Sequence, residues 1–391
     1  MSHLDTTSKD AVFQWRGIPQ PGQLLPLGLQ HVVAAVVGVI TPAILVADTC
    51  GLSSADKTLM IQVSLILTAL ATLLQLFPIF HRIGSGLPVI MGISFAYIPT
   101  LQAIGGEFGL PTILGAEIVG GIVAIVFGVL VKWIRPLFPP LVTGTVIFTI
   151  GLSLYPTAVK YMAGGAGSEW FGSAKSWAVA LITLAVVVFL NHFTKGITKL
   201  ASILIGILAG YVIAYFLGIV DLSGVGSAAW VALPRPMPFD IQFVPAACVS
   251  LGIVYVVNAV QTIGDLSSTT MGGMDRMPTD KELSGGIVGQ GVMSILGAFF
   301  GGLPAATYSQ NVGIVTVNRV INRAVFTLAA GVLLVAGLVP KFASILTTIP
   351  QCVIGGATIS VFATITMTGI RMITEGGFTP RKSSVVGLSV A

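Results

Sequence analysis

Long apolar stretches recur along almost the whole chain, and most have the length of a helix that crosses a lipid bilayer. About 20 apolar residues in a helix cross a bilayer core. The sequence is 54% hydrophobic and 8% charged, whereas about a quarter of the residues of ordinary soluble domains are charged. These features predict an all-α polytopic membrane protein. Twelve apolar spans are expected, at approximately residues 28–46, 58–79, 87–104, 111–131, 138–155, 176–194, 199–219, 244–265, 284–301, 303–318, 324–346 and 350–370.

The basic residues are distributed unevenly over the loops between these spans. Fourteen Lys and Arg residues fall in the loops of one side and five in those of the other. Because basic loops remain in the cytoplasm, the N-terminus and the tail after residue 370 are both expected to be cytoplasmic, in a protein of the cytoplasmic membrane. The net charge of +5 follows from this asymmetry, so no nucleic-acid partner is predicted.

Two short motifs occur twice in the same order. GLPVIMGISF at Gly86–Phe95 matches GLPAATYSQN at Gly302–Asn311, and FPPLVTG at Phe138–Gly144 matches IPQCVIGG at Ile349–Gly356. The spacing indicates a duplicated unit of seven spans, and an odd number of spans inverts the second copy in the membrane. The alternative is a chance match in a chain with 47 glycines. Two such repeats need fourteen spans, so the last two are expected to be missing and the chain to be a fragment or a truncated product.

A polar interruption lies in the tenth span. A Gly-Leu-Pro triplet opens it, and the neighbouring amides Gln310 and Asn311 follow. Polar groups at membrane depth are expected only where protein or a water-filled site surrounds them. We therefore predict a short extended piece at Leu303–Tyr308, followed by a half-helix that starts near Gln310 and directs its free N–H groups at a binding site.

Three polar side chains recur in the eighth span with helical spacing. Asn258, Gln261 and Asp265 occupy positions i, i+3 and i+7, which places them on one helical face within about 60° of one another. They predict a polar surface that faces the site. In the alternative interpretation, Asp265 only marks the cytoplasmic end of the span, because the residues after it are polar.

Single residues in spans 1, 3 and 4 each allow more than one interpretation. His31 is either a structural hydrogen-bonding residue or part of the site. A half-helix is expected to start at Gly92, and Phe95 beyond it either covers a flat ligand or packs in the core. Glu117 must be protonated, paired or turned towards protein, because a charged side chain at the bilayer centre costs on the order of 2.5–3.5 kcal/mol on insertion scales.

Motifs of hydrolytic, redox and ATP-driven proteins are missing from the sequence: it contains no GxSxG, Walker loop, CxxC or HExxH. No enzyme activity, cofactor or metal site is therefore predicted. Side-chain amides offer donors and an acceptor in one plane, which matches the edge of a nucleobase, and an aromatic ring can stack on its face. They favour a neutral planar ligand. A carrier coupled to protons also needs a group that titrates, and Asp265 is the best candidate, with His31 as its neighbour.

The segment QNVGIVTVNR at Gln310–Arg319 resembles the signature of the nucleobase/ascorbate transporter family. The resemblance extends over nearly the entire chain, to the LQH of span 1, the SFAYI of span 3, the QTIGD of span 8 and the PQCVIGG around the start of span 12. It implies a fold of two inverted seven-span repeats, in which the broken helices 3 and 10 contain short strands. It also implies a core domain at residues 28–131 and 244–346 and a gate domain at residues 138–219 and 350–391, after a cytoplasmic segment at residues 1–27.

The resemblance also implies roles for the residues that match the family motifs. Gln310 would bind the base, while Asp265 and His31 would take part in proton coupling. Two positions depart from the pattern: Gln261 stands where the family usually has Glu, which leaves sodium open as the coupling ion, and Asn318 replaces the usual Thr of the signature. The other residues implied at the substrate are Phe95, Gln261, Tyr308, Ser309 and Asn311.

A signature that begins with Gln is typical of the purine carriers of this family. The resemblance thus implies a secondary active transporter that imports a purine nucleobase, xanthine or uric acid, by proton symport with an elevator-type mechanism. The alternatives are a uracil or other nucleobase permease, a sulfate-type anion carrier of the same fold, and a truncated product that does not transport. A homodimer formed through the gate domain is also implied, although two missing spans would weaken it.

Overall fold

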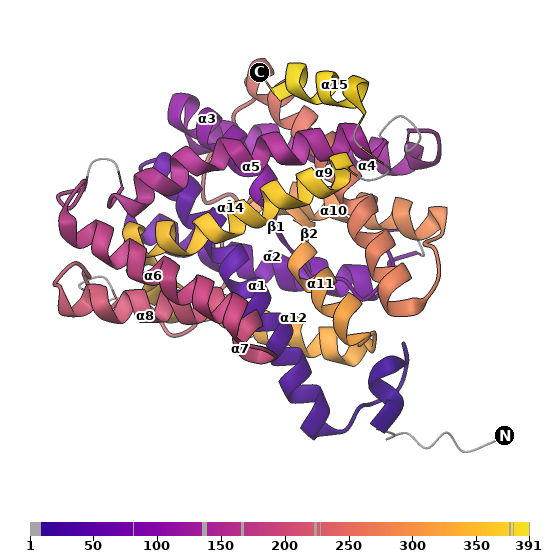
Figure 1. Ribbon diagram of the computed structural model, residues 1–391, viewed down its shortest axis with the longest axis horizontal. Coiled ribbons are helices and arrows are strands. Elements are labelled where there is room, and N and C mark those ends of the chain that lie inside the picture. The colour runs from indigo at the N-terminus through magenta and orange to yellow at the C-terminus, as the bar shows by residue number, and fades with distance from the viewer. Residues whose placement is uncertain are drawn as a thin grey trace. The chain divides into compact units, whose positions relative to one another are not determined.

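The chain divides into two compact units, and Figure 1 labels their helices and the strands β1 and β2. Unit 1 consists of Met1–Ile134 and Ala229–Ala343, and unit 2 consists of Arg135–Ala228 and Ser344–Ala391. This computed structural model describes residues 9–80, 82–134, 139–165, 168–222, 225–226, 228–374, 377 and 379–390.

Unit 1 combines long helices with one pair of short strands. Its elements are η1 (Lys9–Phe13), α1 (Pro21–Thr49), α2 (Ser54–Leu76), β1 (Met91–Ile93), η2 (Phe95–Tyr97), α3 (Ile98–Phe108), α4 (Leu110–Ile134), α9 (Pro245–Met274), α10 (Asp280–Phe300), β2 (Ala305–Thr307), α11 (Ser309–Asn318) and α12 (Arg323–Leu338).

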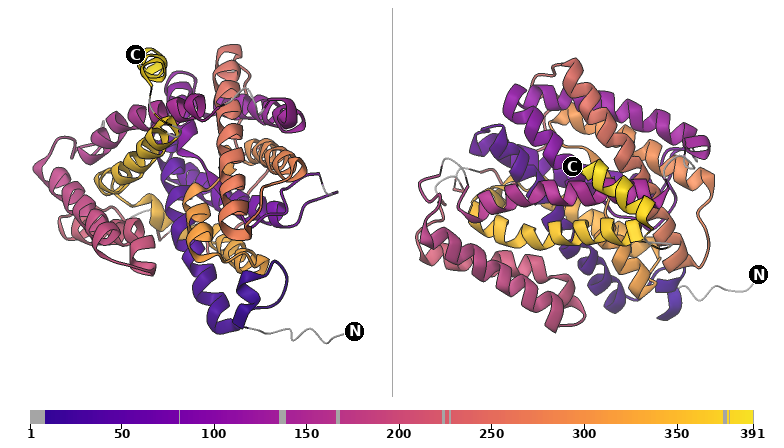
Figure 2. Two further views of the ribbon diagram at one scale, coloured as in Figure 1. Left: turned by 45° about the vertical axis from the view of Figure 1, so that its right-hand side comes forward. Right: turned by 45° about the horizontal axis from the view of Figure 1, so that its top comes forward.

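Unit 2 is built from helices alone in its described part. Its elements are α5 (Pro140–Met162), α6 (Ala174–Phe193), α7 (Ile197–Leu200), α8 (Ser202–Phe216), α14 (Gln351–Thr374) and α15 (Pro380–Val390), and α13 (Pro340–Thr347) begins in unit 1 and ends in unit 2. Helix α5 packs along α14, and α6 packs against both α8 and α14. The α6–α8 pair, drawn in magenta to pink, lies side by side in both views of Figure 2.

The long apolar helices agree with a membrane protein. Eight helices in the described part of the chain are long and apolar enough to cross a membrane, or nine if α12 and α13 form one bent span. The prediction of an all-α polytopic protein is thus confirmed. The predicted span at residues 324–346 comprises two helices, since α12 ends at Leu338 and α13 begins at Pro340. Proline lacks an N–H group and crowds the preceding turn, which favours a break at this position.

The two strands join distant parts of unit 1. They pair antiparallel, with Met91 opposite Thr307, Gly92 opposite Ala306 and Ile93 opposite Ala305. All six residues are buried. Side chains of neighbouring helices complete the pair: Met91 N–H donates to Thr72 Oγ1 of α2, and Ala305 N–H donates to Ser294 Oγ of α10, each at 3.0 Å. These buried backbone N–H groups therefore have hydrogen-bond partners within the protein, where no water reaches them.

The extended piece and the half-helix predicted in the tenth span are confirmed, and the helix start predicted in the third span is wrong. The extended piece contains β2, and the half-helix α11 starts at Ser309. Gly92, however, lies in β1, and α3 starts only at Ile98, after the short η2 turn. Glycine is needed at position 92 because a Cβ there would come within 2.6 Å of the Tyr308 ring.

Helix α9 continues past the polar residues of its face. It ends at Met274, and Asp275 follows in a left-handed conformation with φ 50°. The helix therefore does not end at Asp265, since nine helical residues follow it.

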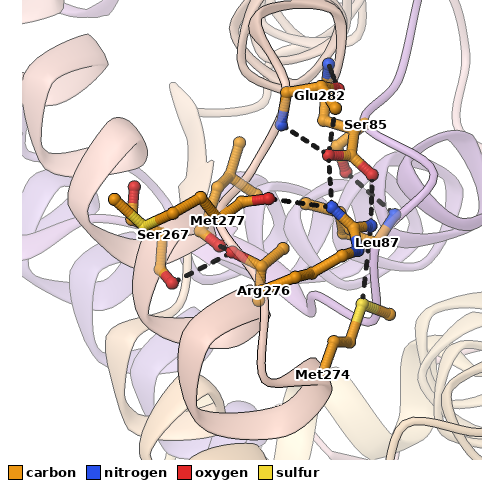
Figure 3. Close-up of polar contacts among 10 residues, drawn as sticks. Ser85, Leu87, Ser267, Met274, Arg276, Met277 and Glu282 are labelled. Carbon is orange, nitrogen blue, oxygen red and sulfur yellow. Dashed lines mark hydrogen bonds and ion pairs between the residues drawn. The ribbon is translucent and has the colours of Figure 1, made fainter.

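In the turn to α10, the Arg276 guanidinium donates to both Glu282 oxygens, at 2.5 and 2.9 Å (Figure 3). These hydrogen bonds raise the pKa of Arg276 above its ordinary value, because the carboxylate stabilises the cation.

Candidate functional site

The Asp265 carboxyl lies where strand β2 passes into helix α11. Thr307 Oγ1 donates to Asp265 Oδ2 at 2.6 Å, and Ser309 Oγ lies 2.8 Å from Oδ1 and 3.0 Å from Oδ2. The Asp265 side chain is 8% exposed. An ionised carboxyl can accept hydrogen bonds at both of its oxygens, and hydroxyl groups donate to both oxygens here.

Ser309 also connects Asp265 to a side-chain amide. Gln261 Nε2 donates to Ser309 Oγ at 3.2 Å. Gln261 and Asp265 are four residues apart on α9, so both face the start of α11. The sequence-predicted residues Gln261, Asp265 and Ser309 are thus brought into one connected group.

The first turn of α11 presents polar groups at its exposed side. Ser309 and Gln310 are exposed, whereas Asn311 is fully buried. The N–H groups of Asn311 and Val312 donate to the Tyr308 carbonyl oxygen, and the start of the helix carries the positive end of the helix dipole. The amides of Gln310 and Gln261 lie at this end and can donate to the carbonyl oxygens of a planar or anionic ligand.

His31 and Asn311 form a separate buried contact between α1 and α11. Asn311 Nδ2 lies 3.0 Å from His31 Nδ1 and donates to the His31 carbonyl oxygen at 3.0 Å. The His31 ring lies against Phe326, with centroids 4.6 Å apart. Among the described contacts none is a hydrogen bond from His31 to Asp265, and His31 instead fixes the first turn of α11.

The aromatic residues predicted at the site are both buried. Tyr308 is 3% exposed and Phe95 is 5% exposed. The Tyr308 ring lies against Gly92, and its hydroxyl occupies the place that a Cβ on Gly38 of α1 would take. Tyr308 therefore fills a slot between β1 and α1.

A second polar cluster lies beside the site, and two of its residues were not expected from the sequence. Asn258 accepts a hydrogen bond from Gln290 of α10 and so turns away from the start of α11. Thr262 Oγ1 donates to Gln290 Oε1 at 2.7 Å and lies 3.5 Å from Thr307 Oγ1. Thr262 and Thr307 thus join this cluster to Asp265. The period of two along β2, which places Thr307 on the face of Ala305, is the signal that could have indicated Thr307.

In the described part of the chain, no group of three or more His, Cys, Asp and Glu side chains could hold a metal ion.

Comparisons with known proteins agree over most of the chain. The profile of a family described as the Permease family matches residues 22–391. The xanthine permease of Bacillus subtilis (strain 168) is 36% identical over 372 residues, which cover 93% of this chain and 83% of that protein. The uric acid permease PucK of the same strain is 36% identical over 365 residues, covering 90% and 82%. The uric acid transporter UacT of Escherichia coli (strain K12) is 32% identical over 378 residues, covering 96% and 78%.

Among solved structures, the transmembrane domain of a cyanobacterial bicarbonate transporter, BicA, matches with a TM-score of 0.67 and 17% identity, and covers 94% of both chains. The anion transporter SLC26A9 matches with a TM-score of 0.62 and 12% identity, over 95% of this chain and 62% of that chain. At these identities the likeness shows a shared fold.

Proposed function

Since the chain belongs to the Permease family and is a transporter rather than an enzyme, we propose that it imports a purine nucleobase, xanthine or uric acid, across the cytoplasmic membrane by proton symport. The xanthine and uric acid permeases among its relatives support this substrate class. The observation that carries the coupling is the position of Ser309, whose hydroxyl contacts both the Asp265 carboxyl and the Gln261 amide.

The Ser309 hydroxyl can link proton binding to substrate binding. When Asp265 is ionised, it accepts hydrogen bonds from Ser309 and Thr307. When Asp265 binds a proton, it becomes a donor itself and no longer needs both hydroxyl protons. The Ser309 hydroxyl is then free to turn and donate to a carbonyl oxygen of the base. Protonation of Asp265 would thus favour substrate binding, as symport requires.

Gln310 and Gln261 are the residues proposed to recognise the edge of the base. Gln310 is exposed in the first turn of α11, and Gln261 is partly exposed beside Ser309. Both amides present donors and an acceptor in one plane, which suits the alternating N–H and C=O groups of an oxidised purine. Phe95 is proposed to face the ring of the base, with Tyr308 and Asn311 holding the strand and the half-helix in place.

An elevator-type movement is part of the proposal. Every proposed site residue belongs to unit 1, which would act as the core domain, while unit 2 would act as the gate. The division of the chain into two compact units supports this assignment. The N-terminus is proposed to be cytoplasmic because of the excess of basic residues in the loops of one side, and a homodimer through the gate domain is proposed as the assembly.

Uptake of radiolabelled xanthine and urate tests the substrate class. Cells that lack their own purine permeases are expected to accumulate one of these purines when they produce this chain, and an excess of the unlabelled purine should compete. Inhibition by uracil but not by xanthine or urate would contradict the proposal, and so would transport that responds only to sulfate or bicarbonate.

The variant Gln310→Ala tests the site. It is expected to lower purine uptake by about 10–100-fold, since loss of a buried hydrogen-bonding partner of the ligand costs about 1–3 kcal/mol. The matched control is Gln242→Ala, which removes an exposed amide in the segment before α9 and should leave uptake unchanged. Equal losses from both variants would argue against the proposed site.

A further inference from the structure

Glu117 of α4 is a buried acid that the proposed mechanism does not use. Its side chain is 0% exposed, and Asp265, at 8%, is the other buried acid among the described residues. Both oxygens of Glu117 are buried and have no hydrogen-bond partner there. A buried acid without a hydrogen-bond partner lowers the stability of the folded protein, so its presence in the interior indicates a functional role.

Helices α4, α9 and α10 enclose the Glu117 carboxyl. Gly297 of α10 lies against it, since a Cβ added there would stand 3.4 Å from Glu117 Oε1. About one turn further along α4, Gly120 makes room for the ring of Tyr255, which a Cβ would overlap. The Tyr97 ring lies 4.9 Å from that of Tyr255, centroid to centroid.

The groups that face Glu117 are neutral hydroxyls. Tyr97 comes from η2, Tyr255 from α9 and Ser294 from α10, and the Ser294 side chain lies within hydrogen-bonding reach of the buried Tyr255 hydroxyl. The charged residues of the elements that pack against α4 lie further off: exposed Glu107 near the end of α3, Asp265 ten residues beyond Tyr255 on α9, and Asp280, Lys281 and Glu282 in the first turn of α10.

These surroundings suit a carboxylic acid rather than a carboxylate. An isolated carboxylate away from water costs several kcal/mol, whereas the protonated form is neutral and supplies its own donor. The unpartnered oxygens of Glu117 therefore favour the protonated form, in contrast to Asp265, whose oxygens are supplied with hydroxyl donors.

Polar side chains connect the surroundings of the two acids. Gln290 Nε2 lies 3.4 Å from the Tyr97 hydroxyl, beside Glu117. Gln290 Oε1 accepts from Thr262, which in turn lies 3.5 Å from Thr307, the partner of Asp265. A change of charge at one acid can therefore alter the proton affinity of the other, because the side chains between them form a continuous set of oriented dipoles.

We propose that Glu117 is a second proton-binding residue of the carrier, which holds a proton in this conformation and exchanges it once in each transport cycle. On release, the O–H bond of the acid breaks, the electron pair stays on Glu117, and the proton passes to water of the compartment that the site then faces. This inference rests on the proposed proton-coupled transport, and it adds a carboxyl on α4 to the one on α9.

Infrared difference spectroscopy on the purified protein tests whether Glu117 carries a proton. The wild type is expected to show a C=O stretching band of a protonated carboxyl at neutral pH, and Glu117→Gln should lack it. The control Glu107→Gln, the same change at an exposed acid, should retain it. A spectrum of Glu117→Gln that keeps the full band would overturn the proposal, and this readout does not depend on which substrate is carried.

Transport by the protein in liposomes tests whether that proton is exchanged. Glu117→Gln is expected to retain exchange of labelled xanthine for unlabelled xanthine and to lose about tenfold in accumulation driven by a pH gradient, within the usual range of coupling between two sites. Glu117→Asp, which keeps an acid, should restore part of the accumulation even if the glutamine variant is poorly folded. Unchanged gradient-driven accumulation in Glu117→Gln would overturn the proposal. Absence of any purine exchange in the wild type would instead contradict the proposed function, while the infrared band would still decide the state of Glu117.

Discussion

The two interrupted segments of unit 1 begin alike and continue differently. Each follows a Gly-Leu-Pro triplet and supplies one strand of the β1–β2 pair. After β1 the chain passes through the buried turn Phe95–Tyr97 into α3. After β2 it reaches the exposed hydroxyl and amide of Ser309 and Gln310 at the start of α11. The first segment thus continues into buried residues, whereas the second exposes polar groups.

This difference shows that an interrupted membrane helix does not by itself expose polar side chains. The strand pair gives hydrogen-bond partners to the backbone groups of both segments, so neither interruption leaves strand N–H and C=O groups unpaired at membrane depth. Only the second segment adds side chains that contact the acid on α9. Substitutions in strand β1 should therefore act mainly on stability, and those at the start of α11 mainly on transport.

The largest effect is expected from Asp265→Asn on the polar side of the comparison. The amide cannot bind and release a proton, and its NH2 group would face the hydroxyls of Thr307 and Ser309. Proton-coupled purine uptake should fall about 100-fold or more, which is the usual scale for loss of a positioned acid–base group. The measurement is the initial rate of uptake at several external pH values. In the variant, the rate should lose the pH dependence that protonation of Asp265 gives it.

The matched control is Asp275→Asn, the same substitution at the exposed left-handed residue after α9. Asparagine tolerates this conformation well, so uptake should hold near the wild-type rate. A similar loss in both variants would break the distinction drawn between the two acids.

Gly92→Ala tests the apolar side. The added Cβ would stand 2.6 Å from the Tyr308 ring, and such overpacking costs about 1–3 kcal/mol. The melting temperature of the purified protein should fall, while the Michaelis constant of the folded fraction for purine should change little. Gly331→Ala is the control, since a Cβ there meets no atom within 4 Å. A change in the Michaelis constant without loss of stability would contradict the assignment of this segment to packing.

Thr307→Val tests the hydrogen bond that strand β2 makes to Asp265. Valine keeps the shape and removes the donor to Asp265 Oδ2, and a hydrogen bond to a charged group contributes about 1.5–3 kcal/mol. Ionised Asp265 should become less favourable, so the pH at which uptake is half-maximal should rise. If the pH profile stayed where it is in the wild type, the Thr307 hydroxyl would have no part in proton coupling.

The smallest effect is expected from Arg319→Ala at the far end of α11. Its ion pair with Asp275 spans 3.2 Å, and the two side chains are 62% and 71% exposed. Exposed ion pairs contribute about 0–1 kcal/mol and are screened by salt. Thermal unfolding and purine uptake should both remain near wild type, and a large loss of uptake would extend the functional surface to the whole of α11.

Much of the polar segment could be predicted from the sequence, because its signals are local. A Gly-Leu-Pro triplet followed by adjacent amides within an apolar stretch predicts the extended piece before α11. The spacing of Gln261 and Asp265 predicts one helical face. The Permease family could likewise be inferred from the segment at Gln310–Arg319.

The remainder depends on contacts between residues far apart in the chain. Gly92 could not be assigned to a strand, because its strand partner Ala306 lies in the other half of unit 1. Asn258 shares a face with Gln261, yet only the position of α10 turns it towards Gln290. Thr307 follows two alanines in an apolar context, so its hydrogen bond to Asp265 could not be recognised before β2 was placed beside α9.

The pairing of β1 with β2 also bears on how the protein is made. Met91 finds its strand partner in Thr307, 216 positions later. While the ribosome is still synthesising the intervening helices, the peptide groups at Met91–Ile93 have no strand to bond and must stay hydrated or be shielded by the insertion machinery. The strand pair of unit 1 can therefore form only after β2 has been synthesised.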